Sequence, residues 1–323
     1  VAGNRTSMCL VPLIGAAGLS MPKTSSRSIT SPAGTADAME VLAPVTFPVA
    51  KMESIARKVG VFLVWGGGAN LASADDKLIK VRNALSLDPE GMLLASILAK
   101  KAAVHATHVL IDIPVGPHTK IRTHAQAMHL KRHFVALGRL LGMKCHVIIT
   151  DGTQPIGKGI GPALEARDAL YILKRDPRRP LDLEKKVLMM AAILLEIAGK
   201  KNPSKLAREL LENGAAYEKM QEMIKAQGGD PFVQPDKIAV GEFQKDFVAT
   251  RDGEIKVINN SIISRIARIA GAPIDRGAGI CLHKHVGDKV RRGKAIFTIH
   301  AQSAAKLAFA LEISQKTPAV EIR

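Results

Sequence analysis

The segment "KTSSRSITSPAGTADAMEVL" (23–42) places four Ser, three Thr and one Arg immediately before an apolar run. Hydroxyl groups, a guanidinium and the backbone N–H groups of a helix N-terminus are groups with which proteins hold phosphate without a P-loop. Pro32 and Gly34 break the preceding strand, Thr35 can cap the helix that follows, and Asp37 suits the dipole of its first turn. A solvated Ser/Thr-rich loop with one helix cap is the alternative interpretation.

Two further stretches carry polar groups that could bind a substrate. In "LDPEGMLLASILAKK", Asp88 precedes a proline at the first helical position, and Ser96 and Lys100 share one helix face four residues apart. The loop "IPVGPHTKIRT" follows a strand and contributes Lys120. From the residues alone, a helix cap, a solvated helix stripe and a basic surface loop are the commoner explanations of these groups.

The elements that must position these residues alternate between strand and helix over the first two-thirds of the chain. Strands are predicted at 61–65, 108–116 and 145–150, and helices at 6–18, 50–60, 88–106, 124–143 and 161–174. Continuous apolar strands between long helices predict an α/β fold with a mostly parallel mixed sheet flanked by helices. Ligands of such sheets bind beyond the carboxyl ends of the strands.

The last third of the chain has a different pattern. Residues 182–227 are typical of helices only, and "GGDPFVQPD" (228–236) has the two Gly and two Pro of a domain boundary. We therefore expect an α/β domain over 1–230 and a C-terminal α+β domain over 231–323.

The C-terminal domain is expected to contain short strands and one helix. "DFVATRDGEIKVIN" predicts a hairpin that turns at Asp252-Gly253. A helix over 260–270 follows, and then short strands joined by Gly turns over 277–301. That spacing is similar to half of a hammerhead or lipoyl-like domain, without a carrier lysine.

The charge balance favours anionic partners. Lys and Arg number 46 against 29 Asp and Glu, which gives a net charge of +17. A nucleic-acid-binding protein is therefore a rival interpretation, but aromatic residues make up only 3% of the chain, which disfavours binding of single strands. The basic run 176–186 lacks interleaved aromatic residues and is more typical of a solvated turn.

Cysteine, histidine and apolar patterns indicate a chain without metal or membrane. Three distant cysteines form no CxxC pair, so we expect neither a disulfide framework nor a zinc ribbon, and a reducing, cytoplasmic setting. His124, His129 and His133 do not have HExxH spacing, so no metal is expected. The longest apolar run, 187–199, is too short for a membrane span and contains Glu196.

The motif "SSRSITSPAGTADAMEVL" closely resembles the signature of the thymidine and pyrimidine-nucleoside phosphorylases. Four more segments resemble the family in the same order: "ASILAKKAA", "HVLIDIPVG", "TDGTQPIGKGIGPALEARDAL" and "GAGICLHKHVGDKVRRG". The resemblance covers essentially the whole chain. It is nearest to the branch of the archaeal AMP phosphorylases and related bacterial thymidine phosphorylase-like proteins.

The resemblance implies that residues 1–230 form a phosphate- and nucleoside-binding domain. It also implies cleavage of an N-glycosidic bond by inorganic phosphate, which serves as co-substrate without any cofactor. Ser25 and Thr35 correspond to the phosphate site, to which the residue types add Arg27. Asp88 matches the proton donor of the monophosphate branch. The substrate-binding positions are Ser26, Arg27, Ser28, Ile29, Thr30, Ser31, Thr35, Ser96, Lys100 and Lys120.

Thymidine or another pyrimidine nucleoside is the substrate that the family as a whole implies, and a nucleoside 5′-monophosphate (AMP, CMP or UMP) is the alternative. Two departures favour the alternative. The nucleoside enzymes have a Lys where Pro114 stands and a Gly-Ala-Phe-Met-like run in place of "PHTK". They also carry a base-recognising Arg near the position of Asp75.

The first residue, Val1, matches a family position just after a His-Ser-x-Gly-Gly run. The resemblance therefore implies that this chain lacks the family's N-terminal part. The family has a helical domain there, to which the segment 66–106 contributes. We expect residues 1–323 alone to fold but to show no phosphorolysis, and we expect the enzyme to be a homo-oligomer, a dimer or larger.

Overall fold

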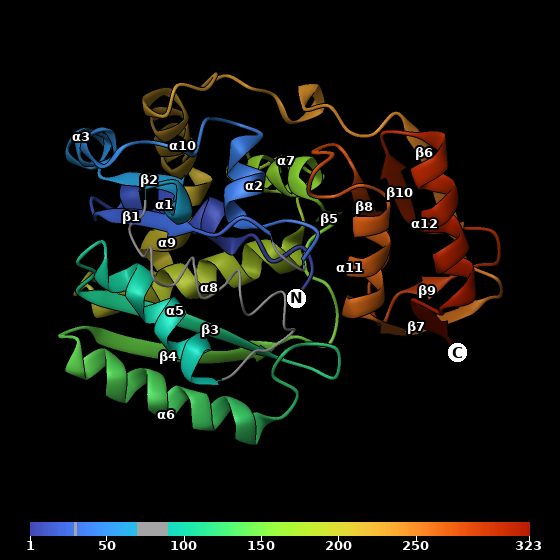
Figure 1. Ribbon diagram of the computed structural model, residues 1–323, viewed down its shortest axis with the longest axis horizontal. Helices are drawn as coiled ribbons and strands as arrows, with labels where there is room; N and C mark the ends of the chain where they lie inside the picture. Colours follow the sequence, from blue (N-terminus) through green and yellow to red (C-terminus); the bar gives the residue numbers. More distant parts are fainter. Residues whose placement is uncertain (29–30, 70–89) are drawn as a thin grey trace.

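The computed structural model describes residues 1–28, 31–69 and 90–323 of the chain. Figure 1 shows the α/β part on the left and the C-terminal part on the right, joined along the top by the chain that follows α10 (Ala215–Ala226). That connection includes the short helix η2 (Pro235–Lys237) and corresponds to the predicted boundary at 228–236.

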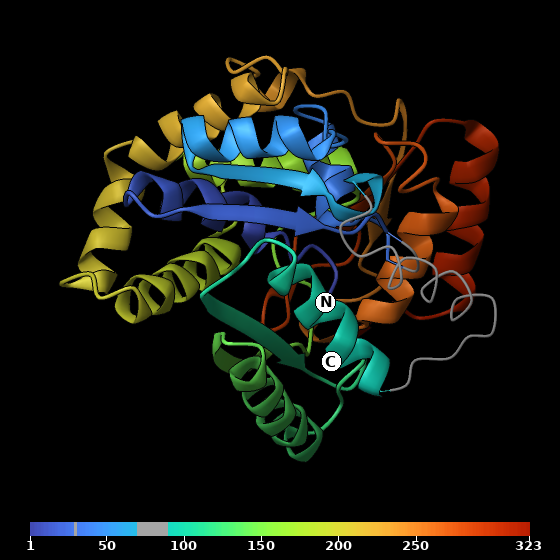
Figure 2. The same ribbon diagram turned by 60° about the vertical axis from the view of Figure 1, so that its left-hand side comes forward.

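Four parallel strands of the α/β part form two pairs. β1 (Met21–Ser25) pairs with β2 (Val61–Trp65), and β3 (His108–Val115) pairs with β4 (Lys144–Asp151). The predicted α/β class is confirmed, but the described strands form two separate two-stranded sheets in place of one continuous sheet. In Figure 2, β1, β2 and β3 run in the same direction.

The helices of the α/β part cover these sheets and fill the space beside them. Their bounds are α1 (Thr6–Ala16), α2 (Thr35–Glu40), α3 (Val49–Val59), η1 (Gly66–Ala69), α5 (Glu90–Ala102), α6 (His124–Leu140), α7 (Pro162–Leu173), α8 (Leu181–Ile197) and α9 (Pro203–Glu212). Local chemistry sets several of these ends. Thr123 and Gln126 form a capping box at the start of α6, and Gly60 ends α3 with a φ of 81°. Among the described helices, none is both long and apolar enough to cross a bilayer.

The two pairs of parallel strands belong to different hydrophobic cores. The larger core surrounds α1, whose Met8 and Leu13 are fully buried, and it includes Leu63 of β2. The smaller core lies between α5, α6, β3 and β4 and contains Leu98 and Phe134. The β3–β4 pair therefore has a core of its own, while Leu110 and Ile148 of its strands also pack against the larger core.

The C-terminal part contains two antiparallel sheets. One sheet has the order β5 (Gly159–Ile160), β8 (Gly279–Leu282), β10 (Ala295–Ala301) and β6 (Phe243–Val248). The other has the order β11 (Val320–Ile322), β7 (Gly253–Ile258) and β9 (Lys289–Val290). The helices α11 (Asn260–Ile269) and α12 (Ala304–Lys316) pack against each other and, through apolar residues, into the same core. Because β5 belongs to the α/β part of the sequence, one sheet is built from both parts of the chain.

The predicted hairpin across Asp252-Gly253 is wrong. β6 pairs with β10, whereas β7 pairs with β11 and β9. Each of the two strands forms its ladder with a distant segment. Ile255 and Ile258 of β7 are fully buried, so the partner of this strand is decided by core packing and not by the turn.

Candidate functional site

The hydroxyl loop, defined as residues 25–35, leaves the carboxyl end of β1 and enters α2. Its backbone is fixed by Asp37, a buried residue in the first turn of α2. The Asp37 Oδ2 atom accepts hydrogen bonds from the N–H groups of Ser28 (2.7 Å) and Gly34 (2.8 Å). Gly34 is the N-cap and Thr35 the first helical residue, so the capping role predicted for Thr35 belongs to its neighbour.

Arg27 ties the same loop to the end of α2. Its guanidinium donates two hydrogen bonds to Glu40, at 2.6 and 2.7 Å, and lies 3.4 Å from an oxygen of Asp37. It also stacks 4.9 Å from the centre of the Trp65 ring. The hydrogen bonds from Arg27 lower the pKa of Glu40 and, reciprocally, raise the pKa of Arg27. Arg27 therefore holds the loop in shape, and two carboxylates balance its charge.

Two of the loop hydroxyls bond to each other's residues and to the loop backbone. Ser28 Oγ donates to the carbonyl of Ser31 and lies 3.2 Å from Ser31 Oγ, which in turn donates to Ala33 O at 2.9 Å. Ser25 and Thr35 are half-buried, and Ser26 is exposed. Ile29 and Thr30, two predicted substrate-binding residues, lie outside the described residues.

The predicted pair on α5 lies beside the strand that carries the hydroxyl loop. Lys100 Nζ donates to Ser96 Oγ at 2.9 Å, as their four-residue spacing predicts. Thr24 Oγ1, just before the loop, donates to the Lys100 carbonyl at 3.4 Å. The structure thus brings Ser96 and Lys100 to the strand that leads into the hydroxyl loop. Asp88, the predicted acid, lies outside the described residues.

Lys120 lies at the other end of α5. It is exposed in a turn after β3 that Thr119 fixes by donating to the Gly116 and Ile121 carbonyls, at 2.9 and 2.6 Å. It lines a surface hollow of about 500 Å³ together with Glu90 of α5. Ser96 and Lys100 lie further along α5, so Lys120 is near the first turn of this helix and the other two residues are in its second half.

One group of described side chains has the composition of a cation site. Glu90, His129 and His133 bring ligand atoms within 4.8 Å of one another, and His129 Nε2 lies 2.9 Å from the Glu90 carboxylate. A carboxylate and two imidazoles are possible zinc ligands, but all three residues are exposed. The expectation of a metal-free protein stays a prediction.

A buried polar triad behind β3 is not evident from the sequence. Asp112 of β3 accepts from Lys186 Nζ at 2.5 Å and from Thr150 Oγ1 of β4 at 2.6 Å. Lys186 is buried and lies on α8, so the interpretation of 176–186 as one solvated turn is wrong for its last residues. The sequence did contain one sign of this triad, because Asp112 interrupts the apolar strand "HVLIDIPVG". A carboxylate removed from water needs a partner.

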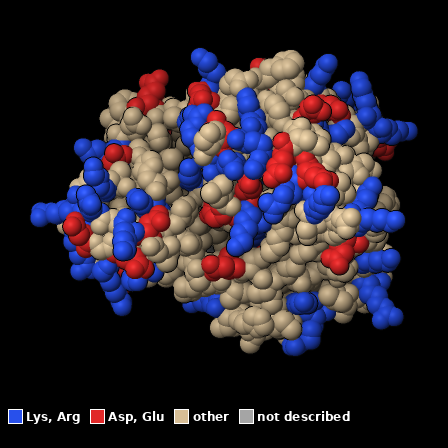
Figure 3. All heavy atoms as spheres, turned by 180° about the vertical axis from the view of Figure 1, so that it is seen from behind, with Lys and Arg blue, Asp and Glu red and all other residues tan. Residues whose placement is uncertain are grey.

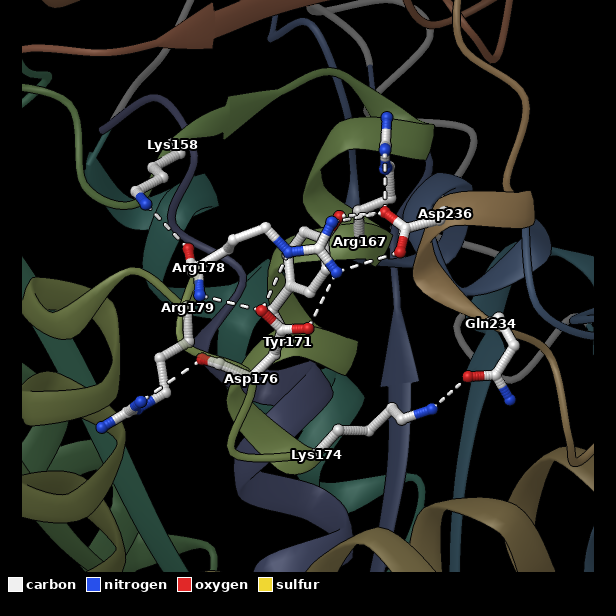
Figure 4. A network of polar contacts seen from close by, with 9 residues as sticks. All are labelled: Lys158, Arg167, Tyr171, Lys174, Asp176, Arg178, Arg179, Gln234 and Asp236. Atoms are coloured by element: carbon white, nitrogen blue, oxygen red, sulfur yellow. Dashed lines mark hydrogen bonds and ion pairs between the residues drawn. The ribbon is translucent and has the colours of Figure 1, made fainter.

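The arginines at the beginning of that basic run are paired with acids. Figure 4 shows Arg178 between Asp176 and Asp236, with contacts of 2.8 and 2.7 Å and the Tyr171 hydroxyl also bonded to Asp236. Arg179 lies 2.6 Å from Glu184. These contacts attach the connection after α10 to α7. On the rear face in Figure 3, Lys and Arg side chains are likewise interspersed with Asp and Glu.

Curated proteins with similar sequences carry phosphorylase names. The chain is 49% identical over 325 residues to the AMP phosphorylase of Thermococcus kodakarensis and 48% identical over 320 residues to that of Methanosarcina acetivorans. It is 45% identical over 314 residues to a Legionella pneumophila protein named "Putative thymidine phosphorylase". These matches cover 100%, 98% and 96% of this chain but only 64%, 63% and 60% of the relatives.

Solved structures with a similar fold are anthranilate phosphoribosyltransferases. The Thermus thermophilus enzyme matches with a TM-score of 0.53 at 21% identity, covering 69% of this chain and 73% of that one. The Saccharomyces cerevisiae enzyme matches with a TM-score of 0.52 at 15% identity, covering 70% of this chain and 69% of that one. At these identities the likeness concerns the fold alone.

Two family models divide the chain much as the structure does. Residues 2–217 match the "Glycosyl transferase family, a/b domain", and residues 255–320 match the "Pyrimidine nucleoside phosphorylase C-terminal domain". The first match covers the α/β part with the hydroxyl loop, and the second covers most of the C-terminal part. The resemblance seen in the sequence is therefore confirmed, and the chain belongs to the pyrimidine nucleoside phosphorylase family of glycosyl transferases.

Proposed function

We propose that this chain forms part of an enzyme that cleaves a nucleoside 5′-monophosphate with inorganic phosphate. Phosphate attacks the anomeric carbon, the N-glycosidic bond breaks, and the free base leaves with a proton while the sugar gains a 1-phosphate. The names of the AMP phosphorylases, at 48–49% identity, support this substrate class over the nucleoside. So do the sequence departures at Pro114 and in the run "PHTK".

The observation that carries the proposal is the hydroxyl loop at the carboxyl end of β1. Asp37 and Glu40 hold its backbone and Arg27 in place before any ligand binds. Hydroxyls on a loop that is held in this way can receive phosphate with less ordering of the backbone. In this proposal Ser25 and Thr35 contact phosphate directly, and Arg27 acts mainly by shaping the loop.

The nucleotide would lie along α5. Ser96 and Lys100 lie on the helix that contacts the strand leading to the hydroxyl loop and would hold the base, and Lys120 would contact the substrate from the far end of the helix. Asp88 would protonate the departing base, because a neutral base is a much better leaving group than its anion. The enzyme would need only inorganic phosphate as co-substrate.

A pyrimidine nucleoside such as thymidine is the second candidate substrate. The name of the Legionella pneumophila relative and the match of the C-terminal part favour it. A nucleoside has no 5′-phosphate, so its binding site needs one cationic contact fewer than that of a nucleotide. The two candidates therefore differ in whether a cationic side chain must bind a 5′-phosphate.

The test compares substrates with an enzyme of full family length. The chain spans about 64% of its Thermococcus kodakarensis relative, so we would fuse it to the part of that relative outside the match. Release of free base from AMP, CMP, UMP, thymidine and uridine would be measured with and without phosphate. Phosphate-dependent release from monophosphates supports the proposal, and turnover of nucleosides alone would replace it with the second candidate. Without the fusion, we expect residues 1–323 to melt cooperatively but to release no base.

A further inference from the structure

The helix α11 lies on the side of the C-terminal part that faces the α/β part (Figure 1). Two neighbouring asparagines at its beginning have different roles. Asn259 is the N-cap, and its side chain accepts hydrogen bonds from the N–H groups of Ser261 and Ile262, at 3.0 and 3.2 Å. Because Asn259 satisfies this end of the helix, the side chain of Asn260 is available for contacts outside α11.

Asn260 uses both halves of its amide group to bridge two segments that are distant in the sequence. The residue is only 3% exposed. Its Oδ1 atom accepts a hydrogen bond from the N–H group of Ala2 at 3.2 Å, and its Nδ2 group donates to the carbonyl of Gly152 at 3.0 Å. One partner can only donate and the other can only accept, so the bridging side chain must carry both an acceptor and a donor. A neutral amide meets this requirement, whereas a carboxylate does not.

The Gly152 end of this bridge supports the turn that carries Lys120. Gly152 follows β4, and its N–H group donates to the carbonyl of Val115, at the end of β3, at 2.8 Å. Ser261 of α11 adds a hydrogen bond of 3.3 Å to the carbonyl of His118, which lies in the turn itself. The beginning of α11 therefore holds the backbone on both sides of Lys120.

The Ala2 end of the bridge supports the hydroxyl loop. The carbonyl of Ala2 accepts a hydrogen bond from the N–H group of Ile156 at 3.1 Å, which fixes this segment against the chain that follows β4. Three residues further on, the guanidinium of Arg5 donates to the carbonyl of Ala33 inside the hydroxyl loop. The short segment from Ala2 to Arg5 thus connects Asn260 to the hydroxyl loop.

We propose that Asn260 is a positioning residue that fixes the spacing between the hydroxyl loop and the turn carrying Lys120. The inference rests on the proposed phosphorolysis, in which the loop holds phosphate and the turn contacts the nucleotide. A misplacement of about 1 Å between two bound reactants can cost about a hundredfold in rate. The C-terminal part of the chain therefore contributes to the reaction, although all of the predicted site residues lie outside it.

Hydrogen exchange in the 323-residue chain tests the bridge without relying on any activity. Asn260→Leu removes both hydrogen bonds and nearly conserves the side-chain volume. We expect it to speed exchange at the amides of Gly152 and Ile156 by about tenfold or more relative to the amides of β10, the scale of one lost buried hydrogen bond.

Gln227→Leu is the matched control. Gln227 is also a buried amide, and it bonds the backbone of Pro44 and Leu63 at 2.9–3.0 Å. Its replacement should lower the free energy of unfolding by a comparable amount, about 1–3 kcal/mol for each buried group left unpaired. It should nevertheless leave the exchange of Gly152 and Ile156 unchanged relative to β10.

Asn260→Asp tests the need for a donor and an acceptor at one position. An ionised Asp repels the carbonyl of Gly152, whereas a protonated Asp can donate to it and still accept from Ala2. We expect the Gly152 amide of this variant to exchange faster than that of the parent at about pH 8, and to approach the rate of the parent at about pH 4, where the carboxyl group binds a proton.

Kinetics of the full-length fusion test the consequence for the reaction. Asn260→Leu should lower kcat for release of base from AMP by about 10–100-fold, because the spacing of the two reactants is lost. The KM values for AMP and phosphate should each change by less than about threefold, because each binding segment keeps its own groups. Gln227→Leu should retain kcat within about threefold of the parent.

Several results would overturn the inference. These are equal acceleration of exchange at β10 and at the two amides, a raised KM with an unchanged kcat, or an equal loss of kcat in the Gln227 control. A parent fusion that releases no base from any substrate would instead refute the proposed function and this role with it. The exchange measurements would still decide whether Asn260 holds both segments.

Discussion

Removing the Asp37 carboxylate should loosen the hydroxyl loop more than any other single change in it. Asp37 is only 7% exposed and accepts two backbone N–H groups from opposite ends of the loop, at 2.7 and 2.8 Å. Its second oxygen lies 3.4 Å from Arg27. Hydrogen bonds to a charged acceptor contribute about 1.5–3 kcal/mol each.

We expect Asp37→Ala to lower the free energy of unfolding by about 2–4 kcal/mol, somewhat less than the sum of both bonds because the loop is partly open to water. Asp37→Asn should cost about 1–2 kcal/mol, since its oxygen can still accept from Ser28 and Gly34 while its amide faces the Arg27 guanidinium. Equilibrium urea unfolding measures both values, with the m-value checking that each variant unfolds in the same manner.

Asp252→Asn is the matched control. The Asp252 carboxylate also accepts a backbone hydrogen bond, from Arg292 N at 2.7 Å, but it is exposed. Its replacement should cost less than about 1 kcal/mol. If Asp37→Ala unfolds within about 0.5 kcal/mol of the parent, the loop does not depend on this carboxylate and the reasoning is refuted.

Four other changes test the site and the fold. In the full-length fusion, Thr35→Val should weaken phosphate binding by about 1–3 kcal/mol, and an unchanged KM for phosphate would contradict a contact there. Asp88→Asn in the same protein should lower kcat by about 10²–10⁴-fold, whereas equal activity would leave Asp88 as a helix cap only. Lys186→Met should destabilise the chain by about 3–5 kcal/mol because it leaves Asp112 buried without its cation, and adding Asp112→Leu should recover much of that loss; additive losses in urea unfolding would argue against the pair. Burial raises the pKa of Asp168 to about 6 despite two backbone hydrogen bonds, so the folded state binds more protons than the unfolded state above about pH 4 and loses stability as the pH rises to 6. Asp168→Asn should remove about 3 kcal/mol of that decline in pH-dependent unfolding, and parallel curves would disprove the assignment.

The sequence alone determined the local elements of this protein. The strand predicted at 61–65 is β2, the one at 108–116 is β3 within one residue, and the helix predicted from 124 begins there. Apolar runs, helical periodicity and capping residues act over a few positions, so they can be read without knowing what lies across the core. The hydroxyl motif likewise located the loop at a strand-to-helix junction and indicated the family.

Only the tertiary structure decided how the polar residues of that motif are used. The sequence placed Arg27 among hydroxyls as a free cation, and the fold pairs it with Glu40 and stacks it near Trp65. Glu40 is thirteen residues from Arg27 in the chain, and no periodicity selects such a partner.

The same holds for the contacts that cross between elements. Asp112 and Lys186 meet inside the molecule, β6 and β7 join different sheets, and β1 and β3 border one cavity. Each of these outcomes depends on which distant segments pack against each other. An unpaired charge or backbone group is costly only when that packing has buried it away from water. The sequence therefore determined the elements and the chemical groups, while three-dimensional packing determined their partners.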